Sequence, residues 1–112
     1  MREDEYKKLE SRIYGFSVNV FSFVKTLINQ NQSDQHTKGL LSGSNQLYAL
    51  FLDVIDSQED RVTEILSKCV QICSNCSTFL ENIKVEKKLL NEKVDLTIEA
   101  NELGRQLNKY LK

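Results

Sequence analysis

The sequence contains no proline and only four glycines among its 112 residues. Strands joined by tight turns rely on both residue types, because proline presets the backbone of a turn and glycine accepts positive φ values. Their scarcity therefore favours long helices. A chain of 112 residues has the size of one domain and buries enough surface to hold a core without disulfides. We expect a single domain over residues 1–112.

Long apolar runs are also absent. The longest, Leu47–Leu52, is followed by Asp53 far short of the roughly 20 residues that span a bilayer. The acidic start Met1–Glu5 lacks the apolar segment of a secretory signal. Three cysteines are an odd number in a chain that needs no disulfide framework, which favours a reducing compartment. These features predict a cytoplasmic protein that is not inserted in a membrane.

The first predicted helix, about residues 4–28, carries two apolar seams. One follows the 3,4 spacing of a heptad repeat, and a second one repeats every seven residues on an adjacent flank. Two seams predict a helix that is covered on two sides. Gly15, inside the pattern, indicates close packing against another helix. The first seam consists of Tyr6, Leu9, Ile13, Phe16, Val20, Phe23 and Leu27, and the second of Tyr14, Phe21 and Ile28.

Three further helices are predicted, over about residues 37–56, 58–84 and 91–111. The polar segment 29–38 is expected to be a loop that contains His36, and Ser57 and Asn91 are expected to cap the third and fourth helices. The run Leu47–Ile55 is apolar nearly all round and should be the most buried stretch. Four helices with short links predict an all-α, antiparallel up-down-up-down four-helix bundle. The apolar positions of the fourth helix are Val94, Ile98, Leu103, Leu107, Tyr110 and Leu111.

Cys69, Cys73 and Cys76 have a spacing that also occurs in iron–sulfur motifs, and Cys73 and Cys76 alone resemble a redox pair. On a helix, however, positions i, i+4 and i+7 share one face, where cysteine packs as a small hydrophobic residue. A structural zinc site needs a fourth ligand, and the only histidine, His36, lies far away in sequence. We therefore favour core packing and expect neither a metal nor a cofactor.

No enzyme signature stands out elsewhere in the sequence. Nothing in the pattern orients His36 toward a nucleophile, and Gly39 and Gly43 lack the lysine and threonine of a phosphate-binding loop. We therefore expect a protein without catalytic activity.

Basic residues gather modestly toward the end of the chain. With 15 basic residues against 16 acidic ones, the net charge of −1 gives no overall attraction to nucleic acid. The ordinary interpretation is a solvated surface, and the alternative is a phosphate-contacting rim that becomes multivalent in an oligomer. We expect nucleic-acid binding to be weak or indirect. The candidate phosphate contacts are Lys84, Lys87, Lys88, Lys93, Arg105 and Lys109.

Several segments resemble a family of small four-helix bundles. These segments are Tyr14–Leu27, Gly39–Ser44, Phe79–Ile83, Leu89–Glu92 and Glu99–Leu107. The chain is similar there to proteins encoded in intervening sequences of bacterial 23S rRNA genes and to the accessory variability determinants of retroelements. The segment Gln46–Val54 is bulkier than the small-residue run typical of the family, with Asp53 in place of a glutamate.

This resemblance implies a homopentamer and, for the retroelement members, binding to a reverse transcriptase and to nucleic acid. The basic surface of those members is missing here. We expect a non-enzymatic, homo-oligomeric bundle that docks on a partner involved in nucleic-acid processing. The alternatives are a helical subunit of a larger hetero-oligomeric complex and a cysteine-ligated metal or redox protein.

Self-association is expected mainly through the first two helices, because they carry more apolar positions than one bundle core covers. Phe51 or Tyr48 should lie near the centre of the contact. The predicted interface residues are Tyr14, Phe21, Ile28, Tyr48, Phe51 and Ile55.

Overall fold

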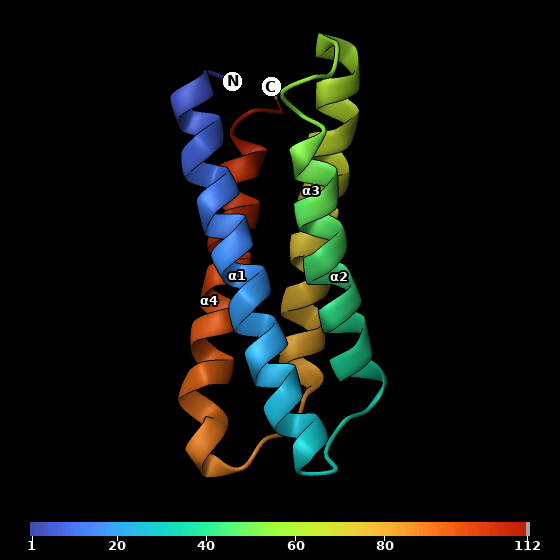
Figure 1. The fold of residues 1–112 in the computed structure, drawn as a ribbon, viewed down its shortest axis with the longest axis vertical. Helices are drawn as coiled ribbons and strands as arrows, with labels where there is room; N and C mark the ends of the chain where they lie inside the picture. Colours follow the sequence, from blue (N-terminus) through green and yellow to red (C-terminus); the bar gives the residue numbers. More distant parts are fainter. Residues whose placement is uncertain (112) are drawn as a thin grey trace.

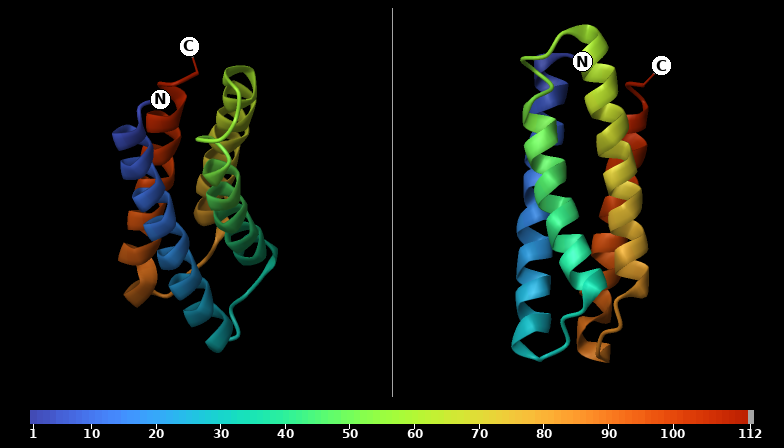
Figure 2. Two further views of the ribbon diagram at one scale, coloured as in Figure 1. Left: turned by 45° about the horizontal axis from the view of Figure 1, so that its top comes forward. Right: turned by 90° about the vertical axis from the view of Figure 1, so that its right-hand side faces the viewer.

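The computed structural model describes residues 1–111 and consists of four long helices joined by short connections (Figure 1). Consecutive helices run in opposite directions, and both chain ends lie at the same end of the bundle (Figures 1 and 2). The predicted all-α, antiparallel up-down-up-down bundle is thus confirmed. The helices are α1 (Glu3–Asn29), α2 (Gln35–Leu52), α3 (Glu59–Asn82) and α4 (Leu90–Asn108), with a short 3-10 helix, η1 (Lys87–Leu89), before α4.

Each helix packs against the next one along the chain, and α4 also packs against α1. In Figure 1, α1 and α2 lie in front of α4 and α3. The bundle therefore has one long face formed by α1 and α2 and an opposite face formed by α3 and α4. Its principal extents are 44 × 21 × 19 Å, so each long face is wide enough for two helices side by side.

The heptad seam predicted for α1 is buried along its whole length, as expected. Its seven side chains all point into the core, where they meet apolar residues of the other three helices. Burying each large apolar side chain stabilises the fold by roughly 1.5–3 kcal/mol. The buried α1 residues of this seam are Tyr6, Leu9, Ile13, Phe16, Val20, Phe23 and Leu27.

Helix α2 begins at Gln35, earlier than the predicted start near Thr37. The reason is an N-cap at Asp34, whose Oδ1 accepts hydrogen bonds from the backbone N–H groups of His36 and Thr37, both at 3.0 Å. A side chain that satisfies free amide groups stabilises a helix start at that point. His36 therefore belongs to the first turn of α2 and not to the loop.

The predicted end of α2, near residue 56, is wrong by a few residues, whereas α3 begins at Glu59, close to the predicted start at residue 58. Helix α2 ends at Leu52, and the chain then turns so that Val54 re-enters the core. Ser57 does not cap α3, because its hydroxyl donates to the backbone carbonyl of Asp53 at 2.6 Å. The N-cap position is occupied by Gln58.

Asn91 likewise does not cap α4. It lies inside the helix, because η1 precedes α4 and the helix already begins at Leu90. Lys93 of α4 instead stabilises the end of α3, where its ammonium group donates to the backbone carbonyl of Ile83 at 2.7 Å. A cation at a helix C-terminus satisfies a free carbonyl and complements the helix dipole.

The close helix packing predicted at Gly15 is found at other glycines. A Cβ atom added at Gly15 would meet nothing within 4 Å. At Gly39 it would lie 2.6 Å from the ring of Phe79, and at Gly43 it would lie 3.0 Å from the sulfur of Cys76. These two glycines let α2 approach α3 closely.

Candidate interaction surface

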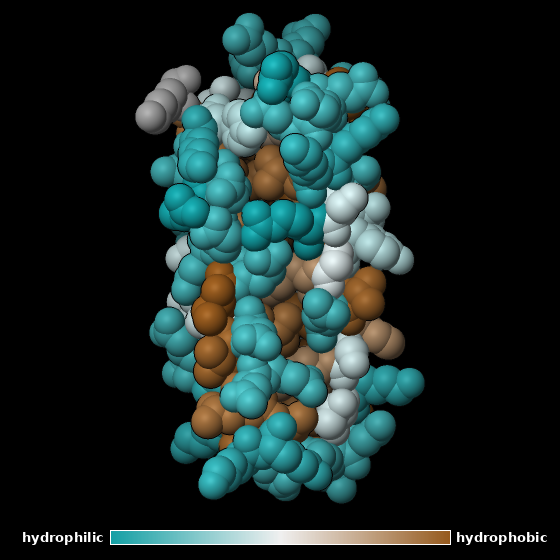
Figure 3. Space-filling view, turned by 90° about the vertical axis from the view of Figure 1, so that its left-hand side faces the viewer, coloured by the Kyte–Doolittle hydropathy of each residue, from teal (hydrophilic) through white to brown (hydrophobic). Residues whose placement is uncertain are grey.

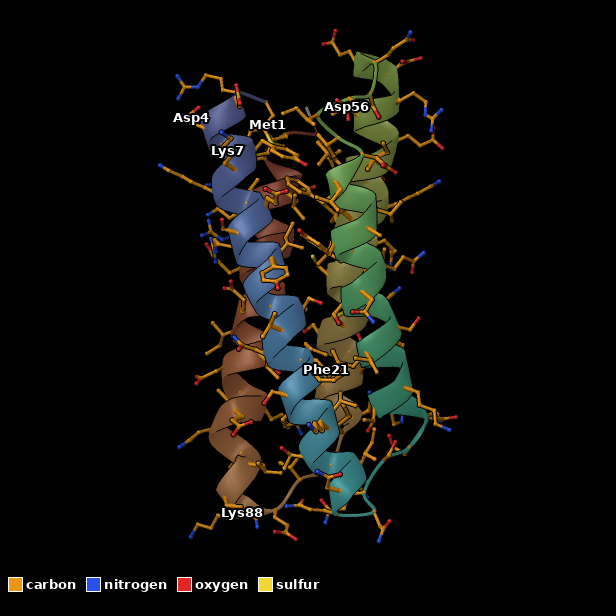
Figure 4. All side chains as sticks on the ribbon, in the orientation of Figure 1. Met1, Asp4, Lys7, Phe21, Asp56 and Lys88 are labelled. Atoms are coloured by element: carbon orange, nitrogen blue, oxygen red, sulfur yellow. The ribbon has the colours of Figure 1, made fainter. Side chains whose placement is uncertain are left out.

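The predicted second seam of α1 lies on the surface of the bundle. Tyr14, Phe21 and Ile28 are all exposed, Phe21 at 57%, and Figure 4 shows Phe21 on the front of α1. Val18 is exposed on the same side and fills the gap between Tyr14 and Phe21. The spacing of 4, 3, 4 and 3 residues from Tyr14 to Ile28 follows the helical repeat, with Lys25 as the polar member. We call Tyr14, Val18, Phe21, Lys25 and Ile28 the α1 stripe.

Val18 is not among the predicted interface residues. Its signal is present in the sequence, because it lies four residues after Tyr14 and three before Phe21. Val18 does not belong to an apolar seven-residue repeat, because the residues seven positions before and after it are Ser11 and Lys25.

Helix α2 extends the α1 stripe at Tyr48. The rings of Tyr14 and Tyr48 lie 5.4 Å apart between centroids with planes inclined by 57°, a favourable tilted arrangement. Together with Glu10 and Ser11 they line a shallow groove of about 220 Å³. The hydroxyl of Ser17 donates to the side-chain oxygen of Asn45 at 3.3 Å, which joins the same two helices. Aromatic side chains of both helices are therefore accessible on the α1–α2 face.

Phe51 does not belong to this surface, so its predicted place in an interface is wrong. Its side chain is fully buried and stacks on Tyr6 in the core. The prediction that Leu47–Ile55 is the most buried stretch is also wrong, because Leu52 and Ile55 are exposed. A sequence that is apolar on all sides does not reveal which of its residues face inward.

Ile55 is exposed but lies apart from the α1 stripe. It belongs to the connection between α2 and α3 and lines a groove of about 470 Å³ with Met1, Tyr6 and Val54. Figure 4 places the neighbouring Asp56 at the same end of the bundle as Met1, whereas Phe21 lies farther down α1. The predicted patch is therefore split into the α1 stripe with Tyr48 and a separate position at the bundle end.

A second apolar stripe lies on α4. Leu90, Val94 and Ile98, spaced by four residues, are all exposed, with Ile98 at 61%. They line a groove of about 340 Å³ together with Glu81 of α3, so this stripe belongs to the α3–α4 face. Figure 3 shows hydrophobic side chains gathered on the half of the bundle far from the chain ends. We call Leu90, Val94 and Ile98 the α4 stripe.

The three cysteines pack into the core, as predicted. Their thiols are free and buried, and burial raises the pKa of each one to about 12. A thiol with such a pKa stays protonated at neutral pH and is a poor nucleophile or metal ligand. Within residues 1–111 no group of three or more histidine, cysteine, aspartate or glutamate side chains is arranged to hold a metal ion. The ring of His36 lies 6.5 Å from that of Phe79.

The candidate phosphate contacts do not form one patch. Lys84, Lys87 and Lys88 are exposed at one end of the bundle, where Figure 4 shows Lys88. Arg105 and Lys109 lie at the other end of α4, roughly 20 Å or more away at 1.5 Å per residue. Several of these basic side chains also form ion pairs or hydrogen bonds within the molecule.

Lys88 pairs with Glu86 at 3.6 Å, and the ammonium group of Lys93 is bound to the carbonyl of Ile83. The guanidinium of Arg105 donates to Glu102 and, with Gln106, lowers the pKa of that carboxyl group to about 2. This separation and internal pairing leave little continuous positive surface.

A groove of about 290 Å³ between α1 and α4 has an acidic lining. Glu92, Asp95 and Glu99 face it from α4, beside Phe16 and Asn19 of α1. Glu99 is already paired, because both of its oxygens accept hydrogen bonds from the guanidinium of Arg12, at 2.7 and 3.3 Å. This bidentate pair ties α1 to α4.

Comparisons with models of protein families, with curated proteins and with solved structures found no match for this chain. The resemblance to the rRNA intervening-sequence family therefore stays a prediction from sequence segments. Among the described helices, α1 to α4, none combines the length and the apolar character needed to cross a membrane.

Proposed function

We propose that this chain is a non-enzymatic assembly protein that associates with further copies of itself through the α1 stripe. The observation that supports the proposal most is the exposure of Tyr14, Val18, Phe21 and Ile28 in one row on α1. Folded monomers seldom leave a contiguous apolar surface of this kind open to water. A contact between copies removes it from water, which contributes roughly 25 cal/mol per Å² of apolar area and offsets the entropy lost on association.

The composition of the α1 stripe suits a protein interface. Aromatic residues dominate the binding energy of many interfaces, because they bury a large area at a small cost in side-chain entropy. Tyr14 and Phe21 of α1 and Tyr48 of α2 supply three such side chains on one face. A specific interface buries about 800 Å² per partner, and a face of 44 by about 20 Å can accommodate that area.

The absence of catalysis is part of the proposal. The thiols have a raised pKa and are buried in the core, and the ring of His36 lies 6.5 Å from the ring of Phe79, between centroids. Docking of the assembled protein on a nucleic-acid-processing partner, such as a reverse transcriptase, is supported by the sequence resemblance alone. The same holds for a homopentamer.

Phe21→Glu is the variant that tests this function. A carboxylate in the centre of the stripe must lose its water when the contact forms, which is strongly unfavourable without a partner. We expect this variant to remain helical by circular dichroism but to sediment as a monomer at micromolar concentration, where the wild-type protein forms a larger species.

Ile98→Glu is the matched control, because it places the same charge on an equally exposed apolar residue of the α4 stripe. It should sediment like the wild-type protein. A Phe21→Glu variant that remains as large as the wild-type protein would contradict the role of the α1 stripe. A wild-type protein that is itself monomeric would favour the alternative of a subunit in a hetero-oligomeric complex.

A further inference from the structure

The central part of the α1 stripe, from Tyr14 to Phe21, is complementary to a reversed copy of itself. Tyr14 and Phe21 are seven residues apart, and the midpoint between them lies between Ser17 and Val18. Glu10 and Lys25 lie at equal distances on either side of the same point. When two α1 helices are placed antiparallel with that point on a two-fold axis, the two aromatic residues meet each other and the two charged residues meet each other.

From this symmetry we propose that two copies of the chain pair through antiparallel α1 helices about a two-fold axis at Ser17 and Val18. The inference rests on the proposed function and specifies its contact. In an isologous interface, residue i of one copy meets residue j of the other, and j meets i. Tyr14 therefore packs on Phe21 of the second copy, and Glu10 pairs with Lys25 of the second copy, each contact occurring twice.

The groove beside Tyr14 has the position that this pairing requires. It is lined by Glu10, Ser11, Tyr14 and Tyr48, and the residue that lies opposite Tyr14 in the second copy is Phe21. The phenyl ring of Phe21, exposed at 57%, then packs in this groove against the outer side of the Tyr14–Tyr48 pair. One turn farther along the second copy, Lys25 then lies beside Glu10 at the rim of the same groove.

The charges of Glu10 and Lys25 support this antiparallel pairing of the two α1 helices. Lys25 is exposed and Glu10 is half-buried, and within residues 1–111 neither side chain forms an ion pair. Within one copy the two residues are 15 positions apart on α1, which corresponds to about 22 Å along the helix. They therefore interact with each other only across a contact between copies. At the axis Ser17 and Val18 are small, which lets two helices approach each other.

A charge-reversal series tests the register. Lys25→Glu brings two carboxylates together at both ends of the contact, and Glu10→Lys brings two ammonium groups together. Because like charges across an interface are strongly unfavourable, each single variant should raise the dissociation constant of the dimer about tenfold or more at low salt. The double variant Glu10→Lys, Lys25→Glu restores opposite charges at both ends and should recover dimerisation to within a few-fold of the wild-type protein.

Sedimentation equilibrium measures these constants, with circular dichroism as the check of folding and Ile98→Glu as the control that should remain dimeric. If the wild-type protein self-associates and Phe21→Glu dissociates it, but the double charge reversal does not recover the dimer, the two-fold register is wrong while the proposed function stands. The register is equally wrong if the wild-type mass corresponds to a pentamer, because a two-fold contact joins copies in pairs. A monomeric wild-type protein would overturn both.

Discussion

The aromatic rings of Tyr6 and Phe51 stack nearly face to face, with centroids 4.8 Å apart and planes inclined by only 12°. Tyr6 lies near the start of α1 and Phe51 near the end of α2, so the contact ties the two helices together at the end of the bundle that carries the chain ends. The Tyr6 hydroxyl donates to the backbone carbonyl of Leu52 at 3.4 Å. Phe51 thus stabilises the monomer and does not contribute to a contact between copies.

Replacing Phe51 by alanine should lower the free energy of unfolding by about 3–5 kcal/mol, as for other fully buried aromatic side chains. The loss combines the transfer of the ring to water with the cavity that remains. Urea denaturation followed by circular dichroism measures it. The exposed Ile98→Ala variant should differ from the wild-type protein by no more than about 0.5 kcal/mol. A Phe51→Ala loss of that small size would contradict the burial of the ring.

The contrast between α1 and α2 shows which parts of this fold can be predicted from the sequence. In α1 the buried seam follows an unbroken heptad of seven apolar residues, and all seven are in the core, as predicted. The other apolar row, Tyr14, Phe21 and Ile28, has only three members and is exposed. In the run from Leu47 to Ile55 nearly every residue is apolar, so periodicity does not distinguish Phe51, which is buried, from Tyr48, which is half-buried. That choice depends on Tyr6, which is distant in sequence.

The cap positions and the glycines are harder to predict for a related reason. Asp34 and Ser57 both have a side chain suited to an N-cap, yet Ser57 bonds back to Asp53 and leaves the α3 cap to Gln58. Gly15 and Gly39 look alike in sequence, and only the position of Phe79 makes Gly39 the site of close approach. Among the candidate interface residues, those of the α1 stripe are predictable because they repeat every seven residues.

Gly39 and Gly15 give a matched pair of variants. Gly39→Ala places a methyl group 2.6 Å from the Phe79 ring, and the displacement of that ring should cost about 1–3 kcal/mol of stability. Gly15→Ala adds a methyl group in open space inside a helix, so it should stabilise the protein by roughly 0.5–1 kcal/mol. Thermal or urea denaturation of both variants provides the measurement. The same sign of change in both would contradict the close approach of α2 to α3 at Gly39.

Stability should fall in alkaline solution because of the buried thiols. Burial raises the pKa of Cys69, Cys73 and Cys76 from the ordinary value of 9.0 to about 12. Below pH 9 the thiols are protonated in both states, and their contribution is fully present. Between pH 9 and 12 the unfolded chain releases protons that the folded chain retains, so each thiol lowers the free energy of unfolding by up to about 1.4 kcal/mol per pH unit.

Urea denaturation under reducing conditions at a series of pH values tests this dependence. The informative comparison is with Cys69→Ala, which removes one of the three thiols and leaves every other titratable group unchanged. Its stability should decline less steeply above pH 9 than that of the wild-type protein. Identical slopes would show that the Cys69 thiol ionises equally well in the folded chain.

Nucleic-acid binding by the isolated protein should be weak and sensitive to salt. The exposed lysines Lys84, Lys87 and Lys88 form a small group at one bundle end, so few counterions are released when they contact phosphates. Fluorescence anisotropy with a labelled RNA should show binding only at low ionic strength, and it should be lost in the double variant Lys87→Ala, Lys88→Ala. Tight binding that persists at physiological salt would contradict the scattered arrangement of the basic side chains.

The mass of the wild-type protein in solution tests self-association most directly. We predict that light scattering at micromolar concentration gives a multiple of the 13.0 kDa chain mass, two copies if α1 pairs with itself about a two-fold axis. The Phe21→Glu variant should give the mass of a single chain under the same conditions. A wild-type mass of 13.0 kDa that does not change on concentration would contradict self-association through the α1 stripe.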